Sequence, residues 1–260
     1  MDRGQRIELL GVPFDGVTMR AAVGRCLEWC AAPRASHTVI TMNAATLCKM
    51  RRDPELKKAC LSGDLIVPDG MPFVWASRLA RVPLPERVAG VDLMAQLLSG
   101  ASANQLSIYL LGARREVVSQ LAGDLPRTHP GLTIAGFRDG YFSPHEHAAI
   151  VEEIRALKPH MLFVGMPSPF KETWCELYRA RLEVPVIVGV GGSFDVLTGH
   201  VRRAPRWLQS MGMEWAWRLS MEPRKMWKRY LSTNGEFLWL LGREILSRRL
   251  KRRPGNRVAG

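Results

Sequence analysis

The chain has 260 residues, 47% of them apolar and 23% charged, which is typical of a globular protein and excludes disorder as the main state. No run approaches the roughly 18 consecutive apolar residues of a membrane-spanning helix, and the N-terminal segment lacks the apolar core of a secretory signal. The five cysteines form no C-x-x-C pair, so we expect reduced thiols in a cytosolic protein and neither a disulfide framework nor a zinc site.

The positive charge is concentrated near the C-terminus. The formal net charge is +13, and residues 200–260 contain 15 Lys and Arg against 4 Asp and Glu, a balance of +11. The first 199 residues contain the remaining 22 against 20, a balance of +2. We therefore divide the chain into a nearly neutral core, residues 1–199, and a basic appendage, residues 200–260.

Short apolar segments alternate with segments of helical pattern along the core. The predicted strands are 37–41, 64–67, 106–111, 132–136, 160–165 and 184–191. The predicted helices are 53–61, 71–80, 113–125, 144–157 and 171–182, with Asp53 and Ser143 as N-caps before prolines. Most strands are apolar on both faces, and this alternation predicts an α/β fold with a mainly parallel sheet and helices on both faces.

The appendage has a different pattern. Segments 204–221, 223–231 and 234–253 predict consecutive helices without a strand between them, and they carry five of the eight tryptophans. Apolar residues recur there at helical spacing, namely Trp207, Met211 and Trp215, and later Phe237, Leu241 and Ile245. These aromatics could pack on the core or insert into lipid. For Trp207 and Trp215 packing on the core is at least as good an interpretation.

Polar residues follow three predicted strands. Thr41 and Asn43 end one strand, Asp69 follows the next in "LIVPDG", and a glycine turn follows the last in "VIVGVGGSFD". Open parallel sheets bind ligands beyond the carboxyl ends of their strands. A glycine turn before a serine that caps a helix can offer backbone N–H groups to a phosphate. We therefore expect a ligand site at this edge of the sheet.

Each of these residues also has a structural interpretation. Asp69 lies in "PDG", which is ordinary turn chemistry. The glycines are explained equally well by tight packing, because the spacing is not G-x-G-x-x-G and no P-loop lysine follows. For Arg87 the sequence favours a surface charge over an anion contact. For Asp92 it favours the N-cap of the following helix.

The sequence offers no metal-binding pattern. It contains no D-x-D, and no cluster of His, Cys and carboxylates has ligand spacing. A bound nucleotide phosphate would then be neutralised by arginine, lysine and helix N-termini.

Several blocks, in order, resemble one known family. They are "TMNAATLCKMRRDPELKKACLSGDLIVPDGMPFVWASRL", "ERVAGVDLM", "VGMPSPFKETW" and "VIVGVGGSFDVLTGHVRRAPRWLQSMGMEWAWRLSMEPRKMWKRYL". Together they look like the WecG/TagA/CpsF glycosyltransferases, family 26, over roughly positions 7 to 245.

The resemblance implies a Rossmann-like core that transfers a sugar from a UDP-sugar to a polyprenyl-diphosphate-linked saccharide, with inversion and without a metal or other cofactor. The implied place is the cytoplasmic face of the bacterial inner membrane, where a peripheral enzyme would serve surface polysaccharide synthesis. The implied partners are therefore the donor, the lipid-linked acceptor and the anionic membrane surface, and no nucleic acid.

The resemblance also implies roles for individual residues. Asp69 matches the proposed catalytic base of the "PDG" block. The residues that match substrate-binding positions are Thr41, Asn43, Arg87, Gly192, Ser193 and Asp195, together with the appendage arginines Arg218, Arg224 and Arg229, which are thought to close over the diphosphate. Lys171, which is also expected to bind substrate, stands where many members carry a glutamine in "S-P-K-Q-E" that is proposed to bind acceptor or donor. Ala44-Ala45 replace the end of "T-P-N-P-E". Both departures bear on the sugar and leave the reaction class unchanged.

Two other classes compete with this hypothesis. A nucleic-acid-binding protein could use the basic, tryptophan-rich tail, but no helix-turn-helix, zinc finger or RNP-like strand accompanies it. A nucleotide-dependent dehydrogenase would need the dinucleotide fingerprint that is missing here. The sequence leaves open the transferred sugar (N-acetylmannosamine, its uronic acid or glucose), the acceptor glycan and whether the chain forms a homo-oligomer.

Overall fold

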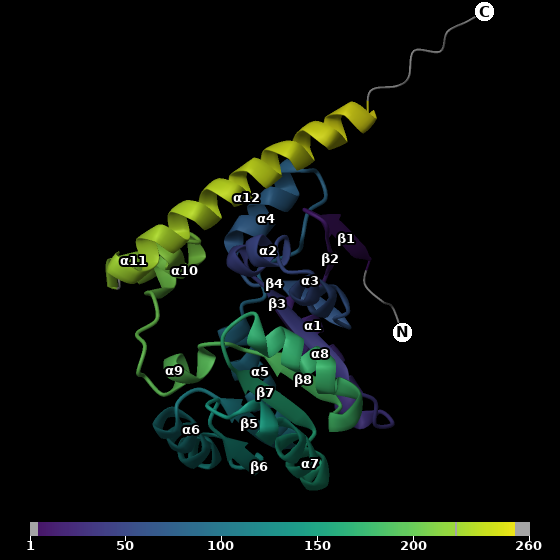
Figure 1. Ribbon diagram of the computed structural model, residues 1–260, viewed down its shortest axis with the longest axis vertical. Coiled ribbons are helices and arrows are strands. Elements are labelled where there is room, and N and C mark those ends of the chain that lie inside the picture. Colours follow the sequence, from purple (N-terminus) through teal and green to yellow (C-terminus); the bar gives the residue numbers. More distant parts are fainter. Residues whose placement is uncertain (1–4, 222, 253–260) are drawn as a thin grey trace, which may run out of the picture.

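A six-stranded parallel sheet forms the centre of the molecule (Figure 1). The computed structural model describes residues 5–221 and 223–252. The strands of the sheet, in spatial order, are β4 (Leu65–Pro68), β3 (His37–Met42), β8 (Val186–Gly189), β7 (Met161–Gly165), β5 (Ser107–Gly112) and β6 (Thr133–Arg138). All neighbouring pairs are parallel. The predicted Rossmann-like α/β fold is confirmed.

Helices cover both faces of this sheet. The core helices are α1 (Met19–Ala31), α2 (Ala44–Met50), α3 (Pro54–Leu61), α4 (Met71–Leu79), α5 (Gly90–Ala103), α6 (Arg115–Thr128), the 3₁₀ turn η1 (Pro144–Glu146), α7 (His147–Leu157), α8 (Phe170–Leu182) and α9 (Ser193–Leu197). Side chains alternate along each strand, so Val39 and Leu65 pack with α1 and α5, whereas Ile40 and Ile66 pack with α2 to α4. Both layers are apolar, which explains the continuous apolar strands.

Two of the predicted helix starts are confirmed. Asp53 is the N-cap of α3, and its side chain accepts a hydrogen bond from the Leu56 N–H at 3.0 Å. Ser143 forms a capping box with Glu146 at η1, which runs into α7. The prediction for Asp92 is wrong, because α5 begins two residues earlier at Gly90 and has no side-chain cap.

An N-terminal hairpin stands outside the main sheet. It consists of β1 (Arg6–Leu9) and β2 (Val12–Asp15), joined at Leu10 and Gly11, which both have positive φ. The buried Asp15 carboxylate accepts a hydrogen bond from the Ile66 N–H at 2.8 Å and pairs with Arg25. This contact satisfies a backbone donor of β4, the strand at the edge of the sheet.

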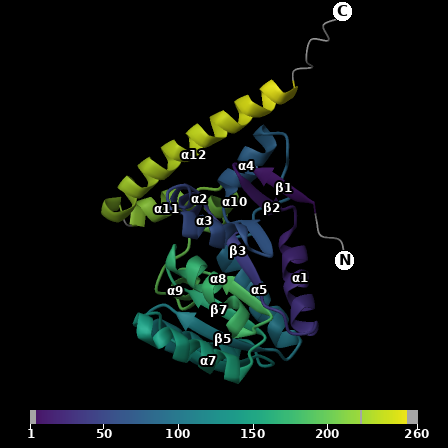
Figure 2. The same cartoon turned by 45° about the vertical axis from the view of Figure 1, so that its right-hand side comes forward.

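The appendage is helical, as predicted, but its segmentation differs. It forms α10 (Arg206–Ser210), α11 (Glu214–Met221) and α12 (Pro223–Arg252). The two expected helices 223–231 and 234–253 are one helix, which continues through Gly235 and crosses one end of the molecule past α2 and α4 (Figure 1, Figure 2).

The two apolar stripes of the appendage behave differently. Phe237 and Leu241 are buried and Ile245 partly buried against the core, where Phe237 meets the ring of Phe73 edge-on at 5.4 Å. Trp207 is 61% exposed. The second stripe therefore completes the core, while the first lies at the surface. The five cysteines are free and buried, as expected.

Candidate active site

The strand ends predicted to carry ligand residues lie together at one edge of the sheet. Met42 pairs with Pro68 in the register of β3 and β4, so Asn43 and Asp69 follow neighbouring strands. The Thr41 hydroxyl donates to the Gly189 carbonyl at the end of β8, at 3.0 Å. Because all strands are parallel, these positions share the carboxyl edge, where doubly wound sheets hold their ligands.

The Asp69 side chain is held by the start of α5. Its Oδ1 atom accepts a hydrogen bond from the Gly90 N–H at 2.9 Å, and its own N–H donates to the Met42 carbonyl at 2.8 Å. The neighbouring Val88 N–H donates to the Pro68 carbonyl at 2.9 Å. The carboxylate is partly buried. These bonds fix its orientation at the rim of the sheet, as a general base requires.

Thr41, near the end of β3, helps to hold the segments around Asp69 in place. It is 4% exposed, and a Cβ added at Gly90 would lie 3.5 Å from its Oγ1 atom. The hydroxyl therefore lies between the end of β8 and the start of α5. Its place indicates that Thr41 fixes the spacing of the segments around Asp69.

Asn43 is the N-cap of α2. Its Oδ1 atom accepts hydrogen bonds from the N–H and the hydroxyl of Thr46, at 2.9 and 3.3 Å. The side chain is partly exposed at the same edge as Asp69. The cap uses the amide oxygen as its acceptor. The group that Asn43 can offer to a ligand is therefore the amide nitrogen, a hydrogen-bond donor.

Arg87 joins a network of four charges rather than standing at the surface. Its guanidinium donates to Glu214 of α11 at 2.5 Å and to Asp92 of α5 at 3.4 Å. Arg203 donates to both Asp92 oxygens, at 2.5 and 2.7 Å, and to Glu214 at 3.2 Å. The side chains are between 15% and 34% exposed. The sequence-based preference for a solvated Arg87 is therefore wrong.

The network is electrostatically balanced. The hydrogen bonds from Arg203 lower the pKa of the Asp92 carboxyl below its usual range, and the same bonds raise the pKa of Arg203. Two arginines alternate with two carboxylates, and one of each comes from the segment after residue 200. The network thus links the appendage to the loop beside Asp69.

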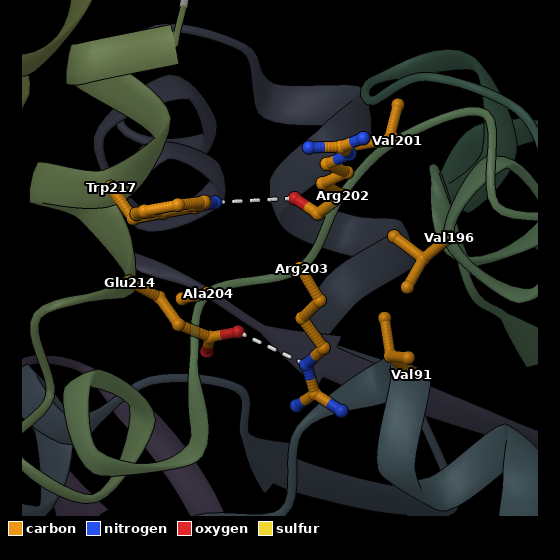
Figure 3. Close-up of a pocket in the computed structure, with 8 residues that line it drawn as sticks. All are labelled: Val91, Val196, Val201, Arg202, Arg203, Ala204, Glu214 and Trp217. Carbon is orange, nitrogen blue, oxygen red and sulfur yellow. Dashed lines mark hydrogen bonds and ion pairs between the residues drawn. The ribbon is translucent and has the colours of Figure 1, made fainter.

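A small hollow borders this network (Figure 3). It is lined by Val91 of α5, Val196 of α9, residues 201–204, and Glu214 and Trp217 of α11. The Trp217 indole N–H donates to the Arg202 carbonyl at 3.3 Å. In Figure 3 the Glu214 carboxylate points toward the Arg203 side chain, to which a dashed line joins it. The hollow marks the junction of core and appendage.

Lys171 is buried at the same edge of the sheet. It is 7% exposed, and its Nζ donates to the Glu172 carboxylate. The other oxygen of that carboxylate is buried and has no hydrogen-bond partner among the described residues. A Cβ at Gly189 would lie 3.3 Å from its side chain. The cation at the position where the resemblance implies a glutamine therefore covers the end of β8 and is neutralised by its neighbour.

The glycine turn after β8 differs from the prediction in one respect. Gly192 is the N-cap of α9, so the prediction that Ser193 caps this helix is wrong. The Ser193 hydroxyl is 1% exposed and donates to the Val190 carbonyl at 2.7 Å. Asp195 lies in the first turn of α9, 3.8 Å from Arg114. Ser193 thus stabilises the turn through the backbone.

Three arginines of the appendage were expected to close over the diphosphate. Arg218 belongs to α11, and Arg224 and Arg229 belong to α12. Their side chains lie outside the described residues. Their roles stay predictions.

The sequence matches a known family over nearly its whole length. The sequence model of the Glycosyl transferase WecG/TagA/CpsF family matches residues 7–251. The chain belongs to this family. The resemblance stated from the sequence blocks is thereby confirmed, and the chain is a glycosyltransferase.

Three relatives of the WecG/TagA/CpsF family carry the same description, N-acetylglucosaminyldiphosphoundecaprenol N-acetyl-beta-D-mannosaminyltransferase. The chain is 35% identical to that of Bacillus spizizenii (strain ATCC 23059 / NRRL B-14472 / W23) over 75% of this chain and 74% of the relative. It is 34% identical to that of Bacillus subtilis (strain 168) over 75% of each chain. It is 31% identical to that of Staphylococcus aureus (strain MW2) over 86% of each chain.

Sequence reasoning missed two residues of the charged network that links the appendage to the loop beside Asp69. Arg203 and Glu214 were part of the quoted blocks, but no local signal distinguished them from other charges of the appendage. Their partners lie 111 and 127 residues away.

Along the described part of the chain, no helix is both long and apolar enough to cross a membrane.

Proposed function

We propose that this glycosyltransferase moves N-acetylmannosamine from a UDP-sugar to a polyprenyl-diphosphate-linked saccharide. Three relatives named as N-acetylmannosaminyltransferases, each covering most of this chain, support the sugar and the lipid-linked acceptor. The family match favours this class over the nucleic-acid-binding and dehydrogenase alternatives. The uronic acid of N-acetylmannosamine and glucose are the alternative sugars.

The observation that carries the mechanism is the placement of Asp69. Its carboxylate lies at the carboxyl edge of the sheet and is oriented by the Gly90 N–H at 2.9 Å. In the proposed reaction Asp69 accepts the proton of the acceptor hydroxyl as that oxygen attacks the anomeric carbon. Attack from the face opposite UDP inverts the configuration, so a UDP-α-sugar gives a β-linked product. One base is enough for this single displacement.

The departing UDP gains negative charge during the transfer. Preorganised cationic and N–H donors lower such a barrier most, because they need no reorganisation. We assign this work to the appendage arginines Arg218, Arg224 and Arg229 and to the turn at Gly192, without a metal ion. The network of Arg87, Asp92, Arg203 and Glu214 supports the assignment, because it ties the appendage to the segment beside Asp69.

The proposed place of action is the cytoplasmic face of the bacterial inner membrane. Residues 1–199 form the catalytic core, and residues 200–260 form the appendage that binds anionic lipid and closes the site. Arginines and lysines near an anionic surface each contribute about 1 kcal/mol of attraction. Trp227 and Trp239, which are 48% and 54% exposed, support contact with the headgroup region.

The test is a panel of donors and acceptors with the purified full chain. UDP-N-acetylmannosamine, its uronate and UDP-glucose are each offered with a diphosphate-linked N-acetylglucosamine acceptor, with and without EDTA. We expect turnover with UDP-N-acetylmannosamine that EDTA leaves unchanged. Turnover only with another UDP-sugar would correct the sugar, and loss of activity in EDTA would contradict the metal-free mechanism.

A further inference from the structure

Helix α4 exposes large apolar side chains next to the candidate base. It begins at Met71, two residues after Asp69. Phe73 and Ser77, on its inner face, are fully buried. Trp75 and Leu79, on the opposite face, are 42% and 61% exposed. The sequence interpretation placed membrane contact only in the appendage, so this surface of the core adds to it.

The exposed face of α4 continues onto the appendage. Gly212, between α10 and α11, has a positive φ of 69°, and a Cβ there would lie 2.7 Å from the Trp75 ring. Only glycine allows this close approach. Met211, which precedes it, is 51% exposed, and Trp207 of α10 is 61% exposed. We define the α4 patch as Trp75, Leu79, Trp207 and Met211.

Positive charge borders the α4 patch. Arg78 and Arg81, on α4 and directly after it, are exposed. Residues 71–83 contain no aspartate or glutamate. Tryptophan and leucine beside arginine are typical of surfaces that enter the headgroup layer of a bilayer, where rings sit at the interface and guanidinium groups meet lipid phosphates.

We propose that the α4 patch inserts into the headgroup layer of an anionic membrane and thereby presents the edge of the sheet at Asp69 to the lipid-linked acceptor. The inference rests on the proposed function, since a lipid-linked acceptor must bring its saccharide to Asp69 from the bilayer. Figure 2 shows α4 and α10 at the same end of the molecule as α12, so core and appendage can meet one surface.

The test compares two double variants of the full chain. Trp75→Ser with Leu79→Ser removes part of the α4 patch. Leu157→Ser with Leu177→Ser removes exposed leucines of α7 and α8, which are 44% and 69% exposed, as the matched control. The measurement is partition into vesicles of phosphatidylcholine with about 30 mol% phosphatidylglycerol. Partition should weaken about tenfold in the first variant and stay unchanged in the control. Equal partition of both variants would overturn the proposal.

Activity assays separate this inference from the proposed function. The patch variant should lose turnover on an acceptor embedded in vesicles but keep it on a short-chain, water-soluble diphosphate acceptor. If the wild-type chain turns over neither acceptor, the proposed function fails, while weakened vesicle partition still supports the patch. The single variant Leu79→Ser repeats the partition test and keeps the contact between Trp75 and Gly212 of the appendage. A wild-type dimer that the patch variant dissociates, with partition unchanged, would assign the patch to a second copy instead.

Discussion

The guanidinium of Arg87 donates to the Glu214 carboxylate at 2.5 Å, although 127 residues separate them. Arg87 belongs to the loop that runs beside Asp69, and Glu214 is the first residue of α11. With Asp92 and Arg203 they form a closed network of alternating charge. This contact therefore links the appendage to the segment that lies beside the candidate base.

Glu214→Gln should loosen the appendage. It removes one charge from the network, at a cost of about 1 kcal/mol for a charge-assisted hydrogen bond that is partly exposed. We expect faster hydrogen exchange in 214–221 and a kcat/KM about fivefold lower, with an unfolding midpoint close to that of the wild type. Glu244→Gln is the matched control, because Glu244 pairs with Arg248 within α12. Exchange that is unchanged by Glu214→Gln would contradict the link.

Asn43 variants separate capping from ligand binding. Asn43→Asp keeps an oxygen that can accept the Thr46 N–H but loses the amide donors and adds a negative charge near Asp69. We expect unchanged thermal stability and a higher KM for the anionic donor. Asn43→Ala should lose about 1 kcal/mol of stability as well. A normal KM for Asn43→Asp would show that Asn43 serves only as a cap.

Phe237 should be essential to the fold. The residue is 6% exposed and packs edge-on against Phe73, so Phe237→Ala should cost about 3 kcal/mol of unfolding free energy in urea titrations. The adjacent Leu238 is 65% exposed, and Leu238→Ala should change stability by less than about 0.5 kcal/mol. Equal effects of the two variants would show that α12 does not complete the core.

Stability should fall on mild acidification, in part through His160. Burial lowers the pKa of His160, whose Nδ1 atom accepts the Ser107 N–H at 3.1 Å. The unfolded chain therefore binds a proton at His160 more readily than the folded chain does. The contribution of the neutral, buried His160 to the free energy of unfolding is complete above about pH 6.5 and is lost as the pH falls below it. Urea titrations at pH 7.5 and 5.5 should show a smaller decrease for His160→Gln than for the wild type. His145→Gln, at an exposed position, is the control; a decrease unaffected by His160→Gln would refute the assignment.

The sheet could be predicted because strands that are buried on both faces have a distinctive apolar pattern. The hairpin could not, since its two strands have four residues each and depend on positive φ at Leu10 and Gly11. The start of α5 was misplaced because its N-cap residue, Ala89, has no side chain that can cap a helix, whereas Asp92 is a strong capping residue that has a different partner here.

The candidate site was predictable only in part. Residues at strand ends could be assigned to one edge, because parallel strands bring them together. Whether a polar side chain turns toward a ligand or toward its own backbone depends on contacts that sequence does not show. Ser193 illustrates this, since its hydroxyl is bonded to the Val190 carbonyl. The network of Arg87 depends on a chain fold that brings residues 87 and 214 together.

The most direct test of the account is Asp69→Asn. The amide keeps an oxygen that can accept the Gly90 N–H, so the fold and UDP-sugar binding, measured by melting and calorimetry, should match the wild type. Loss of the base should lower kcat by about 10²- to 10⁴-fold on the lipid-linked acceptor. A kcat within a factor of about three of the wild type, with donor binding intact, would show that Asp69 is not the base.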